Sequence, residues 1–330
     1  MKRLFKFLMI VFTIGLTAQS LGIEVPHVID TTGAPLMAFA VAKNELAEKE
    51  LIKHFRHAGT WLERVQSKQK WVNNDVIKIN KEGADIQVLI NNNTYPITNV
   101  SRTDDSIVVS LHKYDTENYE VTDDELYALP YDKKDSVQRQ SREALEEKTQ
   151  EHALHSLAPM TNTTNTPIIT TTGSNDGSGR KRLTYNDLIG LKQKLDLLKV
   201  PKKGRILVLS ADHVADLLLE DKALNVQYQN HKEGSIASNY AGFEIYEDIY
   251  SPEYDAALSK IPFGSSTSGK QASVVFYEKG TAKARGTVMR YMRDAKNDPE
   301  FRKSVVGFRL HFIAIPIREK GQAAIVSGTV

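Results

Sequence analysis

The sequence predicts an α+β fold, and three features of the chain support this prediction. Residues 132–157 form a long run of good helix formers without Gly or Pro, and Pro159 closes it. Segments that alternate apolar and polar residues, as strands do, precede this run. Alternating strand-like and helix-like segments follow it. At about 1.5 Å per residue the central helix would be roughly 40 Å long, so we expect it to lie as a strut across other elements.

Length and composition narrow the classes of protein that this chain can belong to. Its 330 residues, 41% of them hydrophobic, are enough for one large domain or two smaller ones with a sizeable core. The 43 basic and 41 acidic residues give a formal net charge of +2, so no whole-molecule field favours nucleic acid or a membrane. The absence of cysteine excludes thiolate catalysis, disulfides and cysteine metal sites, and it leaves the compartment open.

The N-terminus carries a pattern typical of targeting segments. Basic residues precede the apolar run 8–16, and Ala18-Gln19-Ser20 has the small residues of a signal-peptidase site. Taken alone, residues 1–20 favour a secretory signal. The alternative is a hydrophobic arm that packs within an assembly, because the run is too short for a confident membrane span.

The next two segments are predicted to be a helix and then a hairpin. Residues 36–69 place apolar side chains at helical spacing, with charged residues between them. From Trp71 the period changes to that of strands, at 76–80, 86–90 and 106–114, with turns between them. These strands contain few large apolar residues, so the hairpin cannot form a core of its own. We expect it to project and to lie on a partner.

The long helix is expected to bury only a narrow seam. Its apolar side is thin and charged residues cover the rest; the expected seam consists of Val137, Ser141, Ala144, Leu145, Ala153 and Ser156. The stretch 161–182 that follows is rich in Thr, Asn, Gly and Ser, which indicates a mobile connection.

The C-terminal half is predicted to be a compact α/β region followed by two final strands. Thr184 and Asp187 form a variant of the capping box at the start of a Leu-rich helix. Strand 205–209 leads into a helix capped by Ser210 and Asp212, and 242–246 and 272–277 are further strands. Residues 307–328 are predicted to be two strands around a turn at 319–321.

Sequence motifs for chemistry are weak throughout the chain. Gly264 to Lys270 has the glycine and lysine spacing of a phosphate-binding loop, but Gln271 replaces the magnesium-binding hydroxyl and a strand follows where a helix belongs. A flexible surface loop is the better interpretation. His54 with His57, and His152 with His155, are spaced for one helix face but lack the Glu-x-x-His motif. We therefore predict no catalytic, cofactor or metal site.

Basic residues gather between Lys279 and Arg309, interleaved with acidic residues. Their spacing fits no known nucleic-acid module, so a solvated or inter-subunit charged face is favoured over specific DNA recognition. Weak, nonspecific contact with packed DNA stays open.

The order of these elements resembles the major capsid proteins of tailed bacteriophages, whose fold is shared with encapsulins and the floor of herpesvirus capsids. The resemblance runs from about Leu36 onward. It is carried by that order and by the stretches RILVLSADHVADLLLED (205–221), GFEIYED (242–248) and GFRLHFIAIPIREKGQAAIVSG (307–328). The N-terminus, with PLMAFAVAKNELAEKELIKHF (35–55), is similar to capsid proteins of phages that infect Bacteroidota, which favours an inward or inter-subunit arm over secretion.

The resemblance implies a division of the chain into six parts. These are a hydrophobic N-terminal arm (1–35), an N-arm helix (36–70), an E-loop hairpin (71–122), a spine helix with a flexible connection in the peripheral domain (123–183), an axial-type α/β domain (184–270) and return strands of the peripheral domain (271–330). Some members crosslink a hairpin Lys to a neighbour's Asn. Lys78, Lys81 and Lys113 lie in or near this hairpin, but no Asn and Glu partners are identified, so crosslinking is not predicted.

The function implied by the resemblance is assembly without enzymatic activity. Subunits of the family form pentamers and hexamers of an icosahedral head that encloses double-stranded DNA, with separate scaffolding, portal and maturation proteins. The expected location is the virion capsid, assembled in the host cytoplasm. An exported binding protein with a signal at 1–20, an encapsulin-like shell and an enzyme built on the loop at Gly264 are the alternatives. The residues expected at contacts between subunits are Trp71, Ile77, Ile79, Val88, Ile90, Val109, Leu111 and Tyr114.

Overall fold

A computed structural model describes residues 60–73, 76–81, 105–122, 133–221, 225–226, 239–265, 267, 269–298 and 300–329. Within these ranges the chain is a mixture of helices and sheets, as the sequence predicts. No helix among the described residues is long and apolar enough to cross a membrane. The predicted arm over 1–35 lies outside the described residues.

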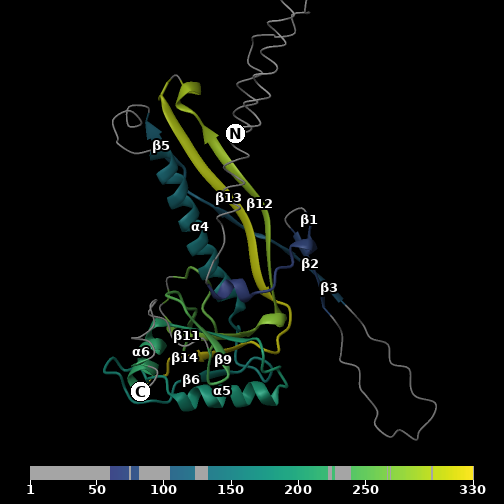
Figure 1. Cartoon of the computed structure of the whole chain (residues 1–330), viewed down its shortest axis with the longest axis vertical. Coiled ribbons are helices and arrows are strands. Elements are labelled where there is room, and N and C mark those ends of the chain that lie inside the picture. The colour runs from purple at the N-terminus through teal and green to yellow at the C-terminus, as the bar shows by residue number, and fades with distance from the viewer. Residues whose placement is uncertain are drawn as a thin grey trace, which may run out of the picture. The chain divides into compact units, whose positions relative to one another are not determined.

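The longest helix, α4 (Lys133–Leu157), packs on a four-stranded antiparallel sheet (Figure 1). Its bounds agree with the predicted run. The buried seam repeats every fourth residue through Val137, Ser141, Leu145, Thr149 and Ala153, and so forms the narrow stripe that the sequence predicts. Ser141 and Thr149 are tolerated there because each hydroxyl donates to a backbone carbonyl one turn earlier, at 2.8 and 2.7 Å. Ala144, which was expected in the seam, is exposed.

The four-stranded sheet is built on two long strands, β12 (Thr281–Arg293) and β13 (Lys303–Pro316), which pair antiparallel with an irregularity between Arg285 and Val288. A 3-10 turn at Ala295–Asn297 joins them. Two short strands, β4 (His112–Asp115) and β5 (Tyr119–Thr122), pair with the other edge of β13. One face of the sheet packs on α4.

The second large sheet has seven strands in the order β6-β14-β11-β7-β9-β8, with β10 also paired to β11. Most pairs are antiparallel, but β7 with β9 and β14 with β6 are parallel. Their bounds are β6 Ile168–Thr170, β7 Arg205–Leu209, β8 Asn239–Tyr240, β9 Phe243–Glu247, β10 Glu253–Tyr254, β11 Lys270–Tyr277 and β14 Ala323–Val326. All five residues of β7 are buried, as expected for a central strand with both faces covered.

Helices α5 (Tyr185–Leu197) and α6 (Ala211–Glu220) cover one face of this sheet (Figure 1). Thr184 and Asp187 form the reciprocal capping box at the start of α5 that the sequence predicts. Ser210 is the N-cap residue of α6 as expected, but its side chain makes no capping hydrogen bond. The opposite face of the sheet contributes Ile206 and Phe276 to the core that also contains the buried side of α4.

Four sequence-based expectations differ from the structure. The predicted boundary at 270 places β7 and β9 in the axial-type part and β11 and β14 in the peripheral part. In the structure all four strands belong to the same seven-stranded sheet. The final two strands, β13 and β14, flank the turn as the sequence predicts. They belong to different sheets, because β13 pairs with β12, β4 and β5 while β14 pairs with β11 and β6.

The expected mobile connection at 161–182 is instead closely hydrogen-bonded. It contains β6, and Thr171 N–H donates to Val326 O at 3.0 Å while Gly173 N–H donates to Arg182 O at 2.9 Å. Its Thr and Asn side chains pair with backbone groups nearby, so the composition that indicated mobility serves turn formation.

The expected helix over 36–70 does not extend to its predicted end. Residues Trp61–Arg64 and Gln69–Trp71 form two 3-10 turns, and residues before Thr60 lie outside the described part. Trp61 and Leu62 bury their side chains in the main core, which fixes this segment by tertiary contacts more than by local helical spacing.

The predicted strand over 106–114 is two strands in two sheets. β3 (Asp105–Ser110) pairs with β2 (Val76–Lys81), which also pairs with β1 (Val72–Asn73), while β4 pairs with β13. Leu111 lies between β3 and β4 and its side chain is buried. This buried side chain fixes the position at which the chain passes from one sheet to the other.

Candidate functional site

The base of the β2–β3 hairpin is anchored on the chain's own long strands. Ile77 and Leu111 are buried against Ala284 of β12 and Ile313 of β13. Partly buried side chains surround this small cluster, namely Trp71, Val72, Val109, Ile315 and Ile317. The base of the hairpin therefore packs on strands of the same chain. The sequence predicted that the hairpin lies on a partner, but it did not identify that partner.

Residues 60–71, here called the strap, lie along the edge of β12. Lys68 N–H donates to Lys283 O at 2.9 Å, and Lys283 N–H donates to Gln66 O at 2.7 Å. The Lys283 ammonium donates to Leu62 O at 2.6 Å, and burial lowers the pKa of this lysine. The strap pairs with part of the exposed sheet edge and leads directly into the hairpin, so it fixes where the hairpin leaves the body.

The predicted contact residues fall into three groups. Ile77 and Leu111 are buried inside the chain and leave no surface for a neighbour. Trp71 and Val109 are partly covered at the hairpin base, and Tyr114 is partly covered against α4. The β2 backbone includes Ile79, and Val88 and Ile90 lie outside the described residues. The segment 82–104, which joins β2 to β3, also lies outside them.

Tyr114 belongs to an aromatic and histidine cluster where β4 meets α4. Its hydroxyl is hydrogen-bonded to His152 Nδ1 at 2.6 Å, and the His152 ring lies 4.6 Å from the rings of both His112 and Phe263. Burial, and then the nearby His112, lowers the pKa of His152 to about 4, so the ring is neutral at pH 7. His155, which the sequence spaces with His152 for one helix face, has its Nε2 bonded to Ile261 O at 2.8 Å. No group of three metal-ligating side chains occurs among the described residues.

A buried carboxylate connects the strap to α4 and to the seven-stranded sheet. Asp248, just after β9, accepts hydrogen bonds from Trp61 Nε1 at 2.5 Å and from Gln150 Nε2 of α4 at 2.7 Å. Burial raises the pKa of Asp248, and these hydrogen bonds oppose the rise. Trp61 also meets Phe276 of β11 edge to face at 5.8 Å between ring centroids.

A second polar network lies under α6. His213 is fully buried, with Nδ1 2.6 Å from Ser273 Oγ and Nε2 3.0 Å from Ser327 Oγ. Asp216, one turn further along α6, accepts two hydrogen bonds from Arg180 at 2.6 and 2.9 Å. Serine and histidine come together here, with the fully buried His213 ring between the two hydroxyl groups.

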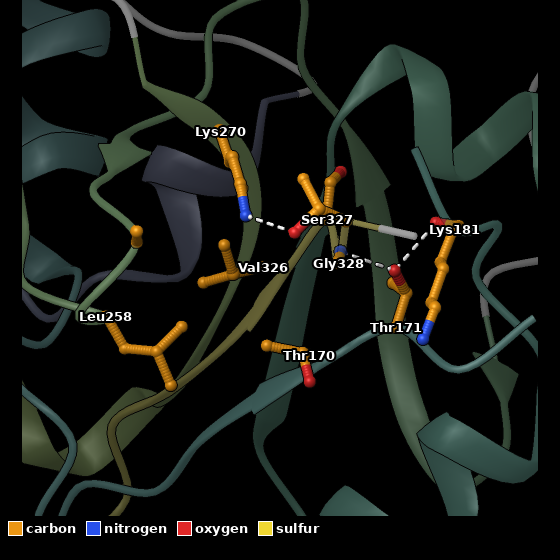
Figure 2. Close-up of a pocket in the computed structure, with 10 residues that line it drawn as sticks. Thr170, Thr171, Lys181, Leu258, Lys270, Val326, Ser327 and Gly328 are labelled. Carbon is orange, nitrogen blue, oxygen red and sulfur yellow. Dashed lines mark hydrogen bonds between the residues drawn. The ribbon is translucent and has the colours of Figure 1, made fainter. Parts of the chain in front are cut away.

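The pocket shown in Figure 2 lies at the carboxyl end of β14 and has a volume of about 260 Å³. Its lining combines threonine, serine and lysine side chains with three apolar ones, and Figure 2 labels Thr170, Thr171, Lys181, Leu258, Lys270, Val326, Ser327 and Gly328. Lys270, the last residue of the loop that imitates a phosphate-binding motif, begins β11 and donates to Thr329 Oγ1 at 3.1 Å. The loop runs into β11, the strand that the sequence predicts there.

Comparison with solved structures shows how this arrangement of two sheets and a long helix is used elsewhere. The capsid structure of cyanophage P-SCSP1u matches with a TM-score of 0.57 and 13% identity, over 81% of this chain and 86% of that one. A virus-like particle from Pyrococcus furiosus matches at 0.52 and 10%, over 86% and 99%. The holo-SrpI encapsulin complex from Synechococcus elongatus matches at 0.52 and 12%, over 81% and 86%. This chain has the capsid and encapsulin shell fold.

Comparison with family models and with curated protein sequences gives no match, so sequence similarity adds nothing to the evidence from the capsid fold. The fold is the expectation that the order of elements led to. The match covers 99% of the Pyrococcus furiosus chain, so nearly all of that chain has a counterpart here.

Sequence reasoning missed the buried polar residues that hold the fold together. Asp248, Asp216 and His213 lie in stretches whose pattern indicated only a strand end or a helix. The one available signal was Asp216 between apolar residues of α6, at a position that helical spacing places on the buried face. No local sequence pattern predicts the hydrogen bond from Trp61 to Asp248, because the two residues are 187 positions apart.

Proposed function

We propose that this protein is a structural subunit that assembles with copies of itself into a closed shell, as the major capsid protein of a tailed bacteriophage. The observation that carries the proposal is the capsid fold, matched over about four fifths of this chain and nearly nine tenths of a phage capsid subunit. In this proposal α4 is the spine helix, the β2–β3 hairpin is the base of the E-loop, and the seven-stranded sheet forms the axial-type domain. The similarity to phages of Bacteroidota stays a prediction.

The hairpin supports a physical account of assembly. Its base is fixed by a small buried cluster and by the strap, so its direction is set before any neighbour arrives. Contact residues predicted beyond the base, Val88 and Ile90, would complete their burial on an adjacent subunit. Association would then supply apolar burial that the single chain lacks, which links stability of the hairpin to subunit concentration. Pentamers and hexamers around double-stranded DNA are the form that the phage capsid resemblance favours.

The test is size-exclusion chromatography with negative-stain microscopy of the full-length chain and of a variant in which a short Gly-Ser linker replaces residues 82–104. This deletion spares Ile77, Leu111 and Tyr114, which pack inside the body. We expect rings or shells from the full chain and a folded, smaller species from the variant. Failure of the full chain to assemble, both alone and when co-expressed with the proteins encoded beside it, would contradict the proposal.

An encapsulin-like shell is the second candidate, because the Pyrococcus furiosus particle and the Synechococcus elongatus encapsulin share the fold. Nucleic acid extracted from purified particles separates the two functions: packaged double-stranded DNA supports a phage head, and a protein cargo supports an encapsulin. A secreted monomer with a mature N-terminus near Leu21 would instead support the exported binding protein.

A further inference from the structure

One end of the α/β body carries a concentration of lysines. Lys194, Lys199, Lys202 and Lys203 are all exposed at the C-terminal end of α5 and in the turn that leads to β7. Among the described residues none of these four has an ion-pair partner. The only acidic residue in the stretch 194–203 is Asp196, which is committed to the buried Arg205 at 2.6 Å. We call these four lysines the basic edge.

A different side of the same body is acidic. The outward stripe of α6 contains Asp212, Ala215 and Leu219, followed by Glu220, and the helix has no Lys or Arg. Asp212 is half exposed and lies 4.0 Å from the Arg180 guanidinium, while Glu220 accepts a hydrogen bond from Tyr185 N–H. We call Asp212 and Glu220 the acidic edge.

The two edges cannot neutralise each other within one chain. Tyr185, the first residue of α5, is bonded to Glu220, so α5 begins beside the acidic edge and ends at the basic edge. Thirteen residues of α-helix span about 20 Å. That separation exceeds the screening length of about 8 Å at physiological ionic strength. Their mutual attraction can therefore act fully only between molecules.

Each edge also has an exposed leucine among its charges. Leu197 is 76% exposed at the basic edge, and Leu219 is 65% exposed on α6. An apolar side chain surrounded by charges of one sign is the arrangement of an interface with a central contact and a charged rim. The two edges thus match in character and are opposite in sign.

We propose that the basic edge of one copy docks against the acidic edge of the next copy, with Leu197 packed near the partner copy's α6. The edges differ and lie at opposite ends of α5, so the contact is head-to-tail. Head-to-tail contacts repeat around an axis and close into rings when the rotation permits. This inference rests on the proposed function, since it assigns a contact to the subunits of the shell. The charges set both the register and the direction of the ring.

Charge reversal on both edges provides the test, measured as assembly by size-exclusion chromatography and negative-stain microscopy. Lys194→Glu/Lys199→Glu/Lys202→Glu/Lys203→Glu, the four-lysine variant, makes both edges acidic, and Asp212→Lys/Glu220→Lys, the two-carboxylate variant, makes both basic. We expect each variant to need at least about tenfold more protein for half-maximal assembly, because like charges then meet. The combined variant that carries all these changes restores opposite signs and should assemble nearly as the native chain does. Arg139→Glu/Lys148→Glu, at exposed positions of α4 outside both edges, is the control and should assemble normally.

Ionic strength gives an independent readout. Raising NaCl from about 0.1 M to about 1 M shortens the screening length from about 10 Å to about 3 Å. It should therefore weaken assembly of the native chain and of the combined variant, and narrow the difference in assembly between these two and the four-lysine and two-carboxylate variants.

The outcomes separate this inference from the proposed function. Normal assembly of both the four-lysine and the two-carboxylate variants would overturn the docking contact and leave the shell function standing. Loss of assembly in both, without recovery in the combined variant, would overturn the pairing of these edges. Normal assembly of the four-lysine variant with reduced binding of double-stranded DNA would overturn the docking contact and assign the lysines to nucleic acid. A native chain that never assembles contradicts the function itself.

Discussion

At the scale of single residues, the buried His213 ties the stability of the α/β body to pH. Burial lowers its pKa to about 4; Asp216 and Asp187 oppose this shift, and Arg180 adds to it. An unfolded histidine has a pKa of about 6.5, so below that pH the unfolded state binds a proton that the folded state refuses. Stability is therefore fully present above pH 6.5 and falls as the pH drops toward 4.

We predict that His213 accounts for a loss of about 2 kcal/mol in the free energy of unfolding between pH 7 and pH 5. Urea unfolding of native protein and His213→Gln at both pH values measures it. The variant should be less stable at pH 7, since its amide replaces a ring bonded to two serines, but its pH dependence should be weaker by that amount. Equal slopes for native and His213→Gln proteins would contradict the assignment.

The buried polar residues also show what sequence reasoning reaches at this scale. The Thr184–Asp187 capping box was predictable because both partners lie within four residues. The hydrogen bond from Trp61 to Asp248 and the bonds from His213 to Ser273 and Ser327 were not, because each joins residues brought together only by the complete fold. A sequence motif can therefore predict hydrogen bonds between residues close in sequence, whereas hydrogen bonds between distant residues can be predicted only once the fold is known.

At the scale of elements, the hairpin base depends on a few side chains. Ile77 has no exposed surface and packs with Leu111, Ala284 and Ile313. We predict that Ile77→Ala destabilises the hairpin base by about 2–4 kcal/mol, because it removes apolar contacts and leaves a cavity. Urea unfolding followed by the fluorescence of Trp71, which borders the same cluster, reports the loss.

Val108→Ala is the matched control for that experiment. Val108 lies on β3, the strand that pairs with β2, but its side chain is 62% exposed. Its replacement should change the stability by no more than about 0.5 kcal/mol. Similar effects of the two substitutions would show that Ile77 is not part of a packed base.

Elements were predicted well where the signal is local and poorly where it is not. The run of helix formers in α4, the apolar β7 and the Leu stripe of α5 all form as expected, since periodicity alone indicates them. The split of 106–114 into β3 and β4 was missed, because the alternation of side chains continues through Leu111 while the hydrogen-bonding partner changes. Periodicity describes which face a residue takes, and it carries no information about which strand lies beside it.

At the scale of the whole molecule, one core joins the two large sheets. Trp61 from the strap, Leu154 from α4, Phe276 from β11 and Phe308 from β13 all belong to it. The sequence suggested separate peripheral and axial parts, but side chains from both meet in this single cluster. Removing either sheet would expose the apolar face of the other, so we expect the two sheets to unfold together. The hairpin base is a separate and much smaller cluster.

This difference in core size predicts the order in which parts of the molecule unfold, and the chain's two tryptophans report it directly. Trp61 lies in the main core of 18 buried residues, and Trp71 borders the hairpin-base cluster of four. Fewer buried contacts mean a lower free energy of local opening. In urea, the Trp71 signal of Trp61→Phe should therefore change at a lower concentration than the circular dichroism of the same variant. The Trp61 signal of Trp71→Phe should instead coincide with its circular dichroism. Coincident transitions in both variants would mean that the hairpin base unfolds with the body, and a neighbouring subunit would then bind a hairpin as stable as the rest of the chain.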